Sequence, residues 1–254
     1  MRYAPATLLP LACILGACAS TPPVAPGVRD GGPTALTPRD TYTGIVAAIE
    51  TGTKSEQRFS ITDGDDAGRT GVRRIEPHSD GAVVAWIVEG EERPRHENHL
   101  TRDDTGGLVV LRMPNRERDV VTRFEPPFVH FPYTLRQNEP VTQELRMLVA
   151  DFDSPDRINR RGDSVSTITY LGSADVSQND QRTRAAVIRT ELESTFGPAN
   201  VVRTTDRWFI PGRGLVGERY EETVRVFGIQ SERRVQEIWL VGTEPIEDEA
   251  PSTE

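Results

Sequence analysis

Short alternating segments separated by turn residues are the feature that most limits how this chain can fold. Turn clusters such as Asp63–Asp66, Ser79–Gly81 and Asp103–Gly107 recur, and the runs between them are rich in β-branched and aromatic residues. Turn signals at intervals of roughly 8 to 12 residues are typical of antiparallel sandwiches and barrels. The pattern predicts an all-β protein, an antiparallel meander that curls into an open half-barrel or packs as a sandwich.

One stretch of the chain fits two periods. Within residues 183–196, Ala185, Ile188 and Leu192 form a helical stripe, whereas every second residue from Ala186 to Phe196 alternates with a polar one. We predict a strand there because its neighbours are strands, and this is the place where we allow a short helix. The other expected strands lie at 42–49, 57–62, 72–75, 82–88, 108–113, 119–124, 141–152, 164–171, 207–210, 218–227 and 233–241.

Two connecting segments interrupt the strand pattern. Pro126 and Pro127 break it, and the apolar residues from Phe128 to Leu135 predict a connector draped over the sheet. The segment Asp153–Asp163 contains a proline among several arginines and predicts a long polar loop.

Composition divides the chain into four parts. Residues 1–17 are typical of a signal peptide, and residues 18–38 are rich in Pro and Gly, which predicts an extended tether. Residues 39–242 form a single β domain, and residues 243–254 predict an acidic disordered tail. The formal net charge of −9 argues against a nucleic-acid partner, because such partners need clustered positive charge.

The amino-terminal segment carries a positive charge at Arg2 and an apolar run from Ala4 to Gly16. This run is too short for a bilayer core, which needs about 20 residues, and small residues end it, as in secretory signals. The motif Leu15-Gly16-Ala17-Cys18 resembles the lipobox of bacterial lipoproteins.

The lipoprotein resemblance implies that Cys18 receives a diacylglycerol, that a peptidase cuts before it, and that acyl groups such as palmitate complete the anchor. Its first partner is then the lipid bilayer, and Ala19 implies the outer membrane, at its periplasmic face. Cys13 leaves with the signal and Cys18 is acylated, so no free thiol remains. This excludes cysteine nucleophiles, disulfides and Cys-ligated zinc.

A second resemblance covers residues 125–242 and rests on Pro126-Pro127-Phe128 and on the segment Trp208–Val216. These residues are similar to a pattern in periplasmic β-rich proteins whose antiparallel sheet forms an open half-barrel, as in lipoprotein carriers of the outer membrane. The resemblance implies a fold and no particular activity, because those domains are mostly of unknown function.

Two motifs that suggest cofactors are incomplete. Gly212, Gly214 and Gly217 match a dinucleotide fingerprint, but the residues after them alternate as a strand where a helix is needed. Asp63 and Asp65 begin a calcium-loop pattern that lacks its closing glutamate. We therefore predict plain turns at both places, with neither cofactor nor metal.

His96 and His99 are the closest pair of histidines. On a helix they would share a face and could bind zinc, whereas on a strand they would point in opposite directions. Pro94 and the surrounding β pattern argue against a helix, so we expect a solvated polar loop. An envelope hydrolase that uses these histidines or paired carboxylates is the alternative function.

The sequence favours a lipid-anchored binding or assembly module that is not an enzyme. With the connector as a cover, the large aromatic residues would border an apolar cleft for an acyl chain or another apolar envelope component. These residues are Trp86, Phe128, Phe131, Trp208 and Trp239. Another envelope protein is the alternative partner. The competing interpretations are that the rings fill a solid core and that the protein is purely structural.

Replacing the acceptor cysteine tests the lipid anchor. We expect Cys18→Ser to abolish incorporation of labelled palmitate and to leave an unprocessed or released protein, because the thiol accepts the lipid. Metabolic labelling measures this, with Cys13→Ser as the control. A Cys18→Ser protein that still carries fatty acid would contradict the assignment.

Overall fold

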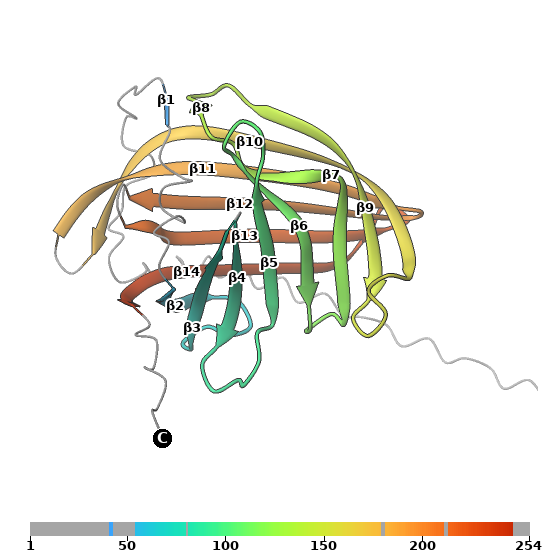
Figure 1. Ribbon diagram of the computed structural model, residues 1–254, viewed down its shortest axis with the longest axis horizontal. Helices are drawn as coiled ribbons and strands as arrows, with labels where there is room; N and C mark the ends of the chain where they lie inside the picture. Colours follow the sequence, from blue (N-terminus) through green and yellow to red (C-terminus); the bar gives the residue numbers. More distant parts are fainter. Residues whose placement is uncertain (1–40, 43–53, 80, 179–180, 211–212, 246–254) are drawn as a thin grey trace, which may run out of the picture.

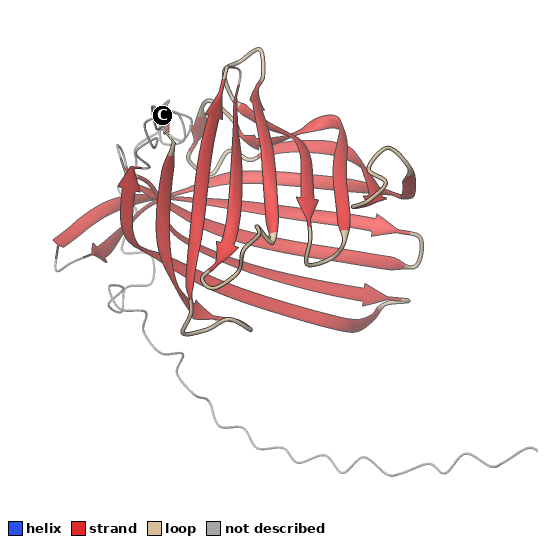
Figure 2. Cartoon of the chain, turned by 60° about the horizontal axis from the view of Figure 1, so that its bottom comes forward, coloured by secondary structure: helices blue, strands red, loops and turns tan. Residues whose placement is uncertain are grey.

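The computed structural model describes residues 41–42, 54–79, 81–178, 181–210 and 213–245 (Figure 1). The regular elements among these residues are all β-strands, as Figure 2 shows. The described residues contain no helix with the length and apolar character needed to cross a membrane. The all-β antiparallel meander expected from the turn spacing is confirmed.

Within the described residues, twelve strands form a closed barrel. Their order around the barrel follows the chain, and β14 then pairs antiparallel with β2. The barrel strands are β2 (Ser55–Asp63), β3 (Thr70–His78), β4 (Gly81–Val88), β5 (His96–Arg102), β6 (Leu108–Asn115), β7 (Val120–Phe131), β9 (Val141–Asp151), β10 (Ile158–Gln178), β11 (Gln181–Phe196), β12 (Ala199–Ile210), β13 (Gly214–Val226) and β14 (Ile229–Pro245). Outside the barrel, β1 (Thr41–Tyr42) pairs with β8 (Leu135–Arg136).

The curl expected of the sheet continues until the sheet closes. In Figure 1 the long strands β10 to β14 lie across the view, while β3 to β7 run down it. The two halves of the sheet therefore face each other with their strands crossed, as the layers of a sandwich do.

The seam between β2 and β14 joins the first and last barrel strands, with Ser55 paired to Pro245 and Phe59 paired to Leu240. A meander places alternate turns at opposite ends of a barrel. One end, which we call the rim, holds the turns at 64–69, 89–95, 116–119, 152–157, 197–198 and 227–228. The chain enters β2 and leaves β14 at the other end, which we call the entry end.

Pairing on both sides decides the ambiguous segment at 183–196, which is a strand as predicted. It belongs to β11, which pairs with β10 along its length and with β12 from Ala186 to Phe196. The helical stripe within the segment has no effect because backbone hydrogen bonds to two neighbours outweigh local preference.

The prediction of an apolar connector after the two prolines is wrong. Phe128 and Phe131 belong to β7, which pairs with β6. The register between these strands shifts where β7 contains Pro126 and Pro127, because proline has no N–H to donate to a ladder. The chain resumes its pairing directly afterwards, so the aromatic residues are part of the barrel wall.

Two polar segments are shorter than predicted. The loop expected at Asp153–Asp163 ends where β10 begins at Ile158, and residues 243–245 of the expected tail belong to β14. In both cases pairing with a neighbouring strand extends the ladder through polar residues. A prediction from local polarity therefore underestimates the length of these two strands.

Several predictions concern residues outside the described ranges. These are the signal peptide at 1–17, the acceptor Cys18, the tether at 18–38, most of the strand expected at 42–49, and the tail beyond residue 245.

Buried apolar side chains form one cluster inside the barrel. Among its largest fully buried members are Tyr170, Phe59, Phe131 and Phe209. Phe131 of β7 meets Phe209 of β12 edge to face, with ring centroids 5.4 Å apart. Since β7 and β12 are not neighbours in the sheet, this contact ties together separate parts of the wall through the interior.

Gly71 lets the indole of Trp86 pack against the backbone of β3. A Cβ on Gly71 would lie 2.1 Å from Cη2 of Trp86, and Trp86 is only 7 % exposed. We expect Gly71→Ala to lower the free energy of unfolding by about 1–3 kcal/mol, because overpacking forces core side chains out of their rotamers. Urea denaturation measures this loss.

Gly242 provides the matched control for this substitution. It lies in β14, and a Cβ there would meet nothing within 4 Å. Gly242→Ala should keep or slightly raise stability, because it only restricts the unfolded chain. Equal losses in the two variants would show that the contact with Trp86 is not responsible.

Candidate functional site

An ion pair faces the interior of the barrel. Arg207 of β12 pairs in register with Glu218 of β13, and Nε of Arg207 lies 2.5 Å from Oε2 of Glu218. Glu218 is paired on its other side with Ile238, a buried core residue, so this row of side chains points inward. The guanidinium carbon of Arg207 lies 5.5 Å from the ring centroid of Phe131. The charges therefore lie directly beside the apolar core.

Solvent reaches this inward-facing pair. The side chain of Arg207 is 14 % accessible and that of Glu218 is 24 % accessible, whereas Phe131 and Phe209 are each 1 % exposed. Barrels of about eight strands can be filled by side chains, whereas larger ones can enclose cavities or channels. The apolar core therefore leaves these two charged side chains partly uncovered.

Arg73 adds a second cation to the interior. It lies on β3 between Gly71 and Ile75, which are both buried, and its Nη1 donates to Oε1 of Gln57 at 3.1 Å. Burial lowers the pKa of Arg73 to about 10, although attraction by Glu218 opposes this. The guanidinium therefore stays charged at neutral pH.

Two neutral histidines complete the group. The ring of His130 on β7 lies 4.2 Å from that of Phe131, and Nδ1 of His130 is buried without a hydrogen-bond partner among the described residues. Burial lowers the pKa of His96, on β5, to about 4. Burial and repulsion by Arg207 and Arg73 bring the pKa of His130 well below its usual value. We call Arg73, His96, His130, Arg207 and Glu218 the inner cluster.

Glu218 is ionised in the inner cluster. Burial acts to raise its pKa, but attraction and a hydrogen bond from Arg207, together with the charge of Arg73, outweigh burial and lower the pKa below its usual value. With both histidines neutral, two guanidinium groups face one carboxylate. The inner cluster thus carries one excess positive charge at neutral pH.

A second group, which we call the rim triad, comprises Arg118, Arg203 and Glu222. Glu222 is 2 % exposed and accepts hydrogen bonds from Arg203, whose Nε lies 2.9 Å from Oε2, and from Arg118. Arg118 lies in the β6–β7 turn, on the opposite side of the ring from β13. Its ion pair therefore spans the interior, and a pair between Glu117 and Arg234, 3.5 Å apart, also joins opposite sides.

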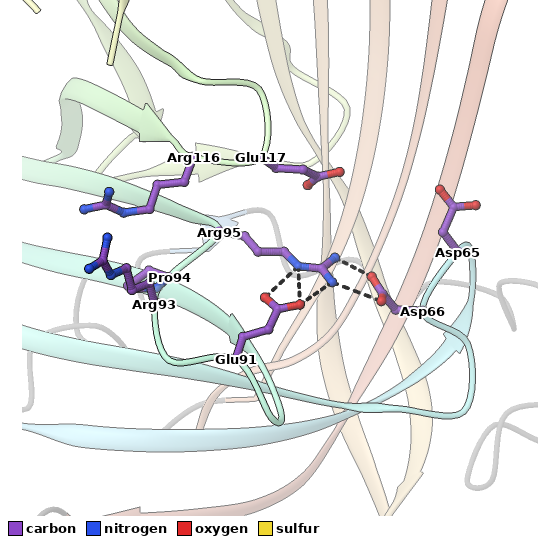
Figure 3. Close-up of a pocket in the computed structure, with 8 residues that line it drawn as sticks. All are labelled: Asp65, Asp66, Glu91, Arg93, Pro94, Arg95, Arg116 and Glu117. Carbon is purple, nitrogen blue, oxygen red and sulfur yellow. Dashed lines mark hydrogen bonds and ion pairs between the residues drawn. The ribbon is translucent and has the colours of Figure 1, made fainter. Parts of the chain in front are cut away.

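A shallow hollow of about 440 Å³ lies on the rim (Figure 3). At its centre, Arg95 donates from Nη1 to Oδ2 of Asp66 at 2.5 Å and from Nη2 to Oε1 of Glu91 at 2.6 Å. Four carboxylates face three guanidinium groups here, so the hollow has no excess positive charge. Its lining residues are Asp65, Asp66, Glu91, Arg93, Pro94, Arg95, Arg116 and Glu117.

The structure separates the two histidines that are close in sequence. Both lie on β5, so the predicted polar loop is wrong. His96 faces the interior, whereas His99 lies on the outer face, where its Nε2 is 3.1 Å from Oε2 of Glu97. Among the described residues, no group of three or more His, Cys, Asp or Glu side chains is arranged to hold a metal ion.

The aromatic residues predicted to border an apolar cleft lie in two places. Trp86, Phe128 and Phe131 are members of the buried core, at 7 %, 6 % and 1 % exposure. Trp208 and Trp239 are partly buried, and strand alternation directs them outward, with ring centroids 5.0 Å apart. Their predicted cover is a strand of the barrel. Contact of these residues with an apolar ligand stays a prediction.

The aspartate motif is a turn, whereas the described part of the glycine motif lies in a strand and Gly212 lies outside the described residues. Oδ1 of Asp63 accepts a hydrogen bond from the N–H of Gly64 at 2.8 Å, and Gly64 and Gly68 both have positive φ. Gly214 and Gly217 lie in β13, so a strand follows the glycine-rich segment, as predicted.

Sequence reasoning missed the inner cluster, although strand alternation contains part of its signal. Glu218 and Glu222 share a face of their strand with Tyr220 and Val224, and this is the more apolar side of the segment. Charged residues on a buried face indicate an interior polar site. Arg73 and His130, the other members of the cluster on β3 and β7, come from distant strands that only the closure of the barrel brings near.

No family model matches the chain, and no curated protein matches it either. Among solved structures, the chain is similar to the hypothetical lipoprotein YmcC from Escherichia coli, with 12 % identity and a TM-score of 0.33 over 75 % of this chain and 86 % of that one. It is also similar to a presumed lipoprotein from Parabacteroides distasonis, with 8 % identity and a TM-score of 0.36 over 76 % and 95 % of the two chains. Likenesses this distant carry no argument about function.

The buried histidines should make the protein sensitive to mild acid. A histidine in the unfolded chain binds a proton near pH 6.5, whereas His96 resists protonation until about pH 4. The unfolded state binds more protons between these values, so the free energy of unfolding decreases as pH falls through this window. The lowered pKa of Glu218 acts below this carboxyl's usual value of 4.5, where its stabilising contribution is lost.

We expect His96→Gln to reduce this acid sensitivity. From pH 7 to pH 5 the wild type should lose roughly 1–2 kcal/mol more than the variant, because one such histidine contributes at most about 1.4 kcal/mol per pH unit. Urea unfolding at both pH values measures this. From pH 8 to pH 9 the two proteins should change alike. Equal losses from pH 7 to pH 5 would rule out a contribution of His96.

Proposed function

We propose that this protein is a lipid-anchored component of the cell envelope whose barrel binds a polar ligand in its charged interior, without catalysing a reaction. The observation that carries the proposal is the accessibility of Arg207 and Glu218, two inward-facing charged side chains that the core does not cover. A purely structural barrel would gain nothing from such charges, because taking them from water is costly.

The first and last barrel strands meet at the entry end, where Ser55 pairs with Pro245. The chain from the proposed anchor at Cys18 therefore enters the barrel at this end. Ala19 after the acceptor cysteine favours the outer membrane and its periplasmic face.

The protonation states of the inner cluster favour binding over catalysis. A general acid or base is most effective when its pKa lies near the working pH. The pKa of His96 is about 4, and Arg207 holds the pKa of Glu218 below its usual value, so neither group meets that condition near neutral pH. An envelope hydrolase based on His96 and His99 is also disfavoured, because the two side chains lie on opposite faces of β5.

An apolar envelope component such as an acyl chain is the second candidate ligand. The partly exposed pair of Trp208 and Trp239 on the outer face favours it. Trp86, Phe128 and Phe131 argue against an apolar ligand inside the barrel, because all three side chains are already buried in the hydrophobic core.

Native mass spectrometry of the full chain, purified in detergent from its own envelope, tests the proposal. We expect a non-covalently bound small molecule that leaves on denaturation. The double variant Arg207→Met, Glu218→Leu should fold, since a hydrophobic replacement of both partners of a buried ion pair is often tolerated. It should lose the bound molecule, because the charges that hold the ligand are gone.

An outer-face ion pair provides the control. Nε of Arg189 lies 2.7 Å from Oδ1 of Asp206 on neighbouring strands, and Arg189→Met with Asp206→Leu should keep the bound molecule. A wild-type protein without any bound molecule would contradict the proposal. So would a molecule that the interior double variant retains.

A further inference from the structure

The charge of the polar ligand follows from the composition of the inner cluster. We propose that the barrel interior binds an anionic group, a carboxylate or a phosphate, between Arg73, Arg207 and His130. This inference rests on the proposed function and specifies the chemistry of the same site.

The interior collects positive charge that the rest of the chain does not share. The chain as a whole has a formal net charge of −9, yet Arg73 and Arg207 face the single carboxylate of Glu218. The rim triad repeats this ratio, with Arg118 and Arg203 on Glu222. Only 14 % of the Arg207 side chain and 24 % of the Glu218 side chain is accessible, so an unbalanced cation here is partly desolvated, which is costly. A bound anion would neutralise it.

Unused hydrogen-bond donors also favour an anionic ligand. A guanidinium group has five N–H donors, and within the described residues Arg73 uses its Nη1 on Gln57. Arg207 uses Nε on Glu218, and its Nη1 reaches Oγ1 of Thr190 only at 3.4 Å. The N–H donors without a protein partner are open to an anionic oxygen, which an ammonium or guanidinium group does not offer.

His130 supplies a second, independent observation. Its Nδ1 is buried without a partner among the described residues, and buried polar atoms are nearly always paired in native proteins. The ring centroid of Phe131 lies 4.2 Å from that of His130 and 5.5 Å from the guanidinium carbon of Arg207, so His130 and Arg207 flank the same ring. The charges of Arg207 and Arg73 both act on the His130 ring. In the tautomer that carries its proton on Nδ1, His130 would donate to an anion held there.

The arginine side chains narrow the class of anion. The planar guanidinium fork matches the two oxygens of a carboxylate or phosphate and binds them bidentately. Phe131 lies under Arg207 at 5.5 Å, so the anionic group would stop at the apolar core. The remainder of the ligand would extend toward the rim. The rim hollow does not compete for the anion, because its carboxylates outnumber its guanidinium groups.

Calorimetric titration of the full chain in detergent, with inorganic phosphate and with malonate, tests the proposal. Potassium chloride holds the ionic strength constant. We expect at least one anion to bind and Arg73→Met to weaken that binding by about 10-fold or more, as for a lost hydrogen bond to a charged group. Arg73→Lys keeps the charge without the fork and should retain part of the affinity. Arg189→Met, on the outer face, should bind as the wild type does.

The His130 ring gives a readout that a merely structural role of Arg73 would not change. A bound anion favours the protonated ring, so the pKa of His130 should rise on saturation with the anion. Nuclear magnetic resonance of the histidine rings in the free and saturated protein measures this. The ring of His99 on the outer face should not respond.

Each outcome decides the proposal. Binding of phosphate alone assigns a phosphate group, and binding of malonate alone assigns a carboxylate. Binding of neither anion, or unchanged binding by Arg73→Met, would overturn the anionic ligand. If native mass spectrometry then still finds a neutral molecule in the wild type, the proposed binding function stands and only the inferred charge fails.

Discussion

Closure of twelve strands into one ring is the constraint on which the rest of this structure depends. Once every strand has two neighbours, the width of the ring is set, and the interior must be filled by whatever side chains face inward. The apolar cluster around Phe131 and Phe209 fills part of it. The remaining interior holds arginine and glutamate side chains that solvent still reaches. A chain with 36 % hydrophobic residues has little more apolar volume to offer.

The charges inside the ring are arranged so that each carboxylate is held by arginines. Glu218 meets Arg207, and Glu222 meets Arg203 and Arg118. Such groups contribute little net stability, because the loss of hydration offsets much of the attraction between the partners. They do hold the side chains in one geometry before any ligand arrives. Pre-ordered side chains reduce the entropy lost on binding, so the arrangement suits recognition better than it suits stability.

The sequence was sufficient for the fold class and for most strands, because period-two alternation and turn residues are local properties. It was insufficient wherever a distant partner decided the outcome. The segment after Pro127 pairs with β6 despite its prolines, and Ile158 pairs with Ala150 inside a stretch predicted to be a loop. The sequence did not predict the inner cluster for the same reason. Glu218 lies on a face that alternation marks as buried, but nothing local places Arg73 beside it.

The seam between β2 and β14 has a consequence for how the chain is made. A hydrogen bond at this seam joins Thr62 to Glu237, which are 175 positions apart. The first barrel strand leaves the ribosome early, and its outer edge stays unpaired until the last strand has been synthesised. Unpaired edges are where chains join wrongly to one another. The interval between the synthesis of β2 and that of β14 is thus the period in which this protein is most exposed to aggregation, and pairing with the carboxyl-terminal strand ends it.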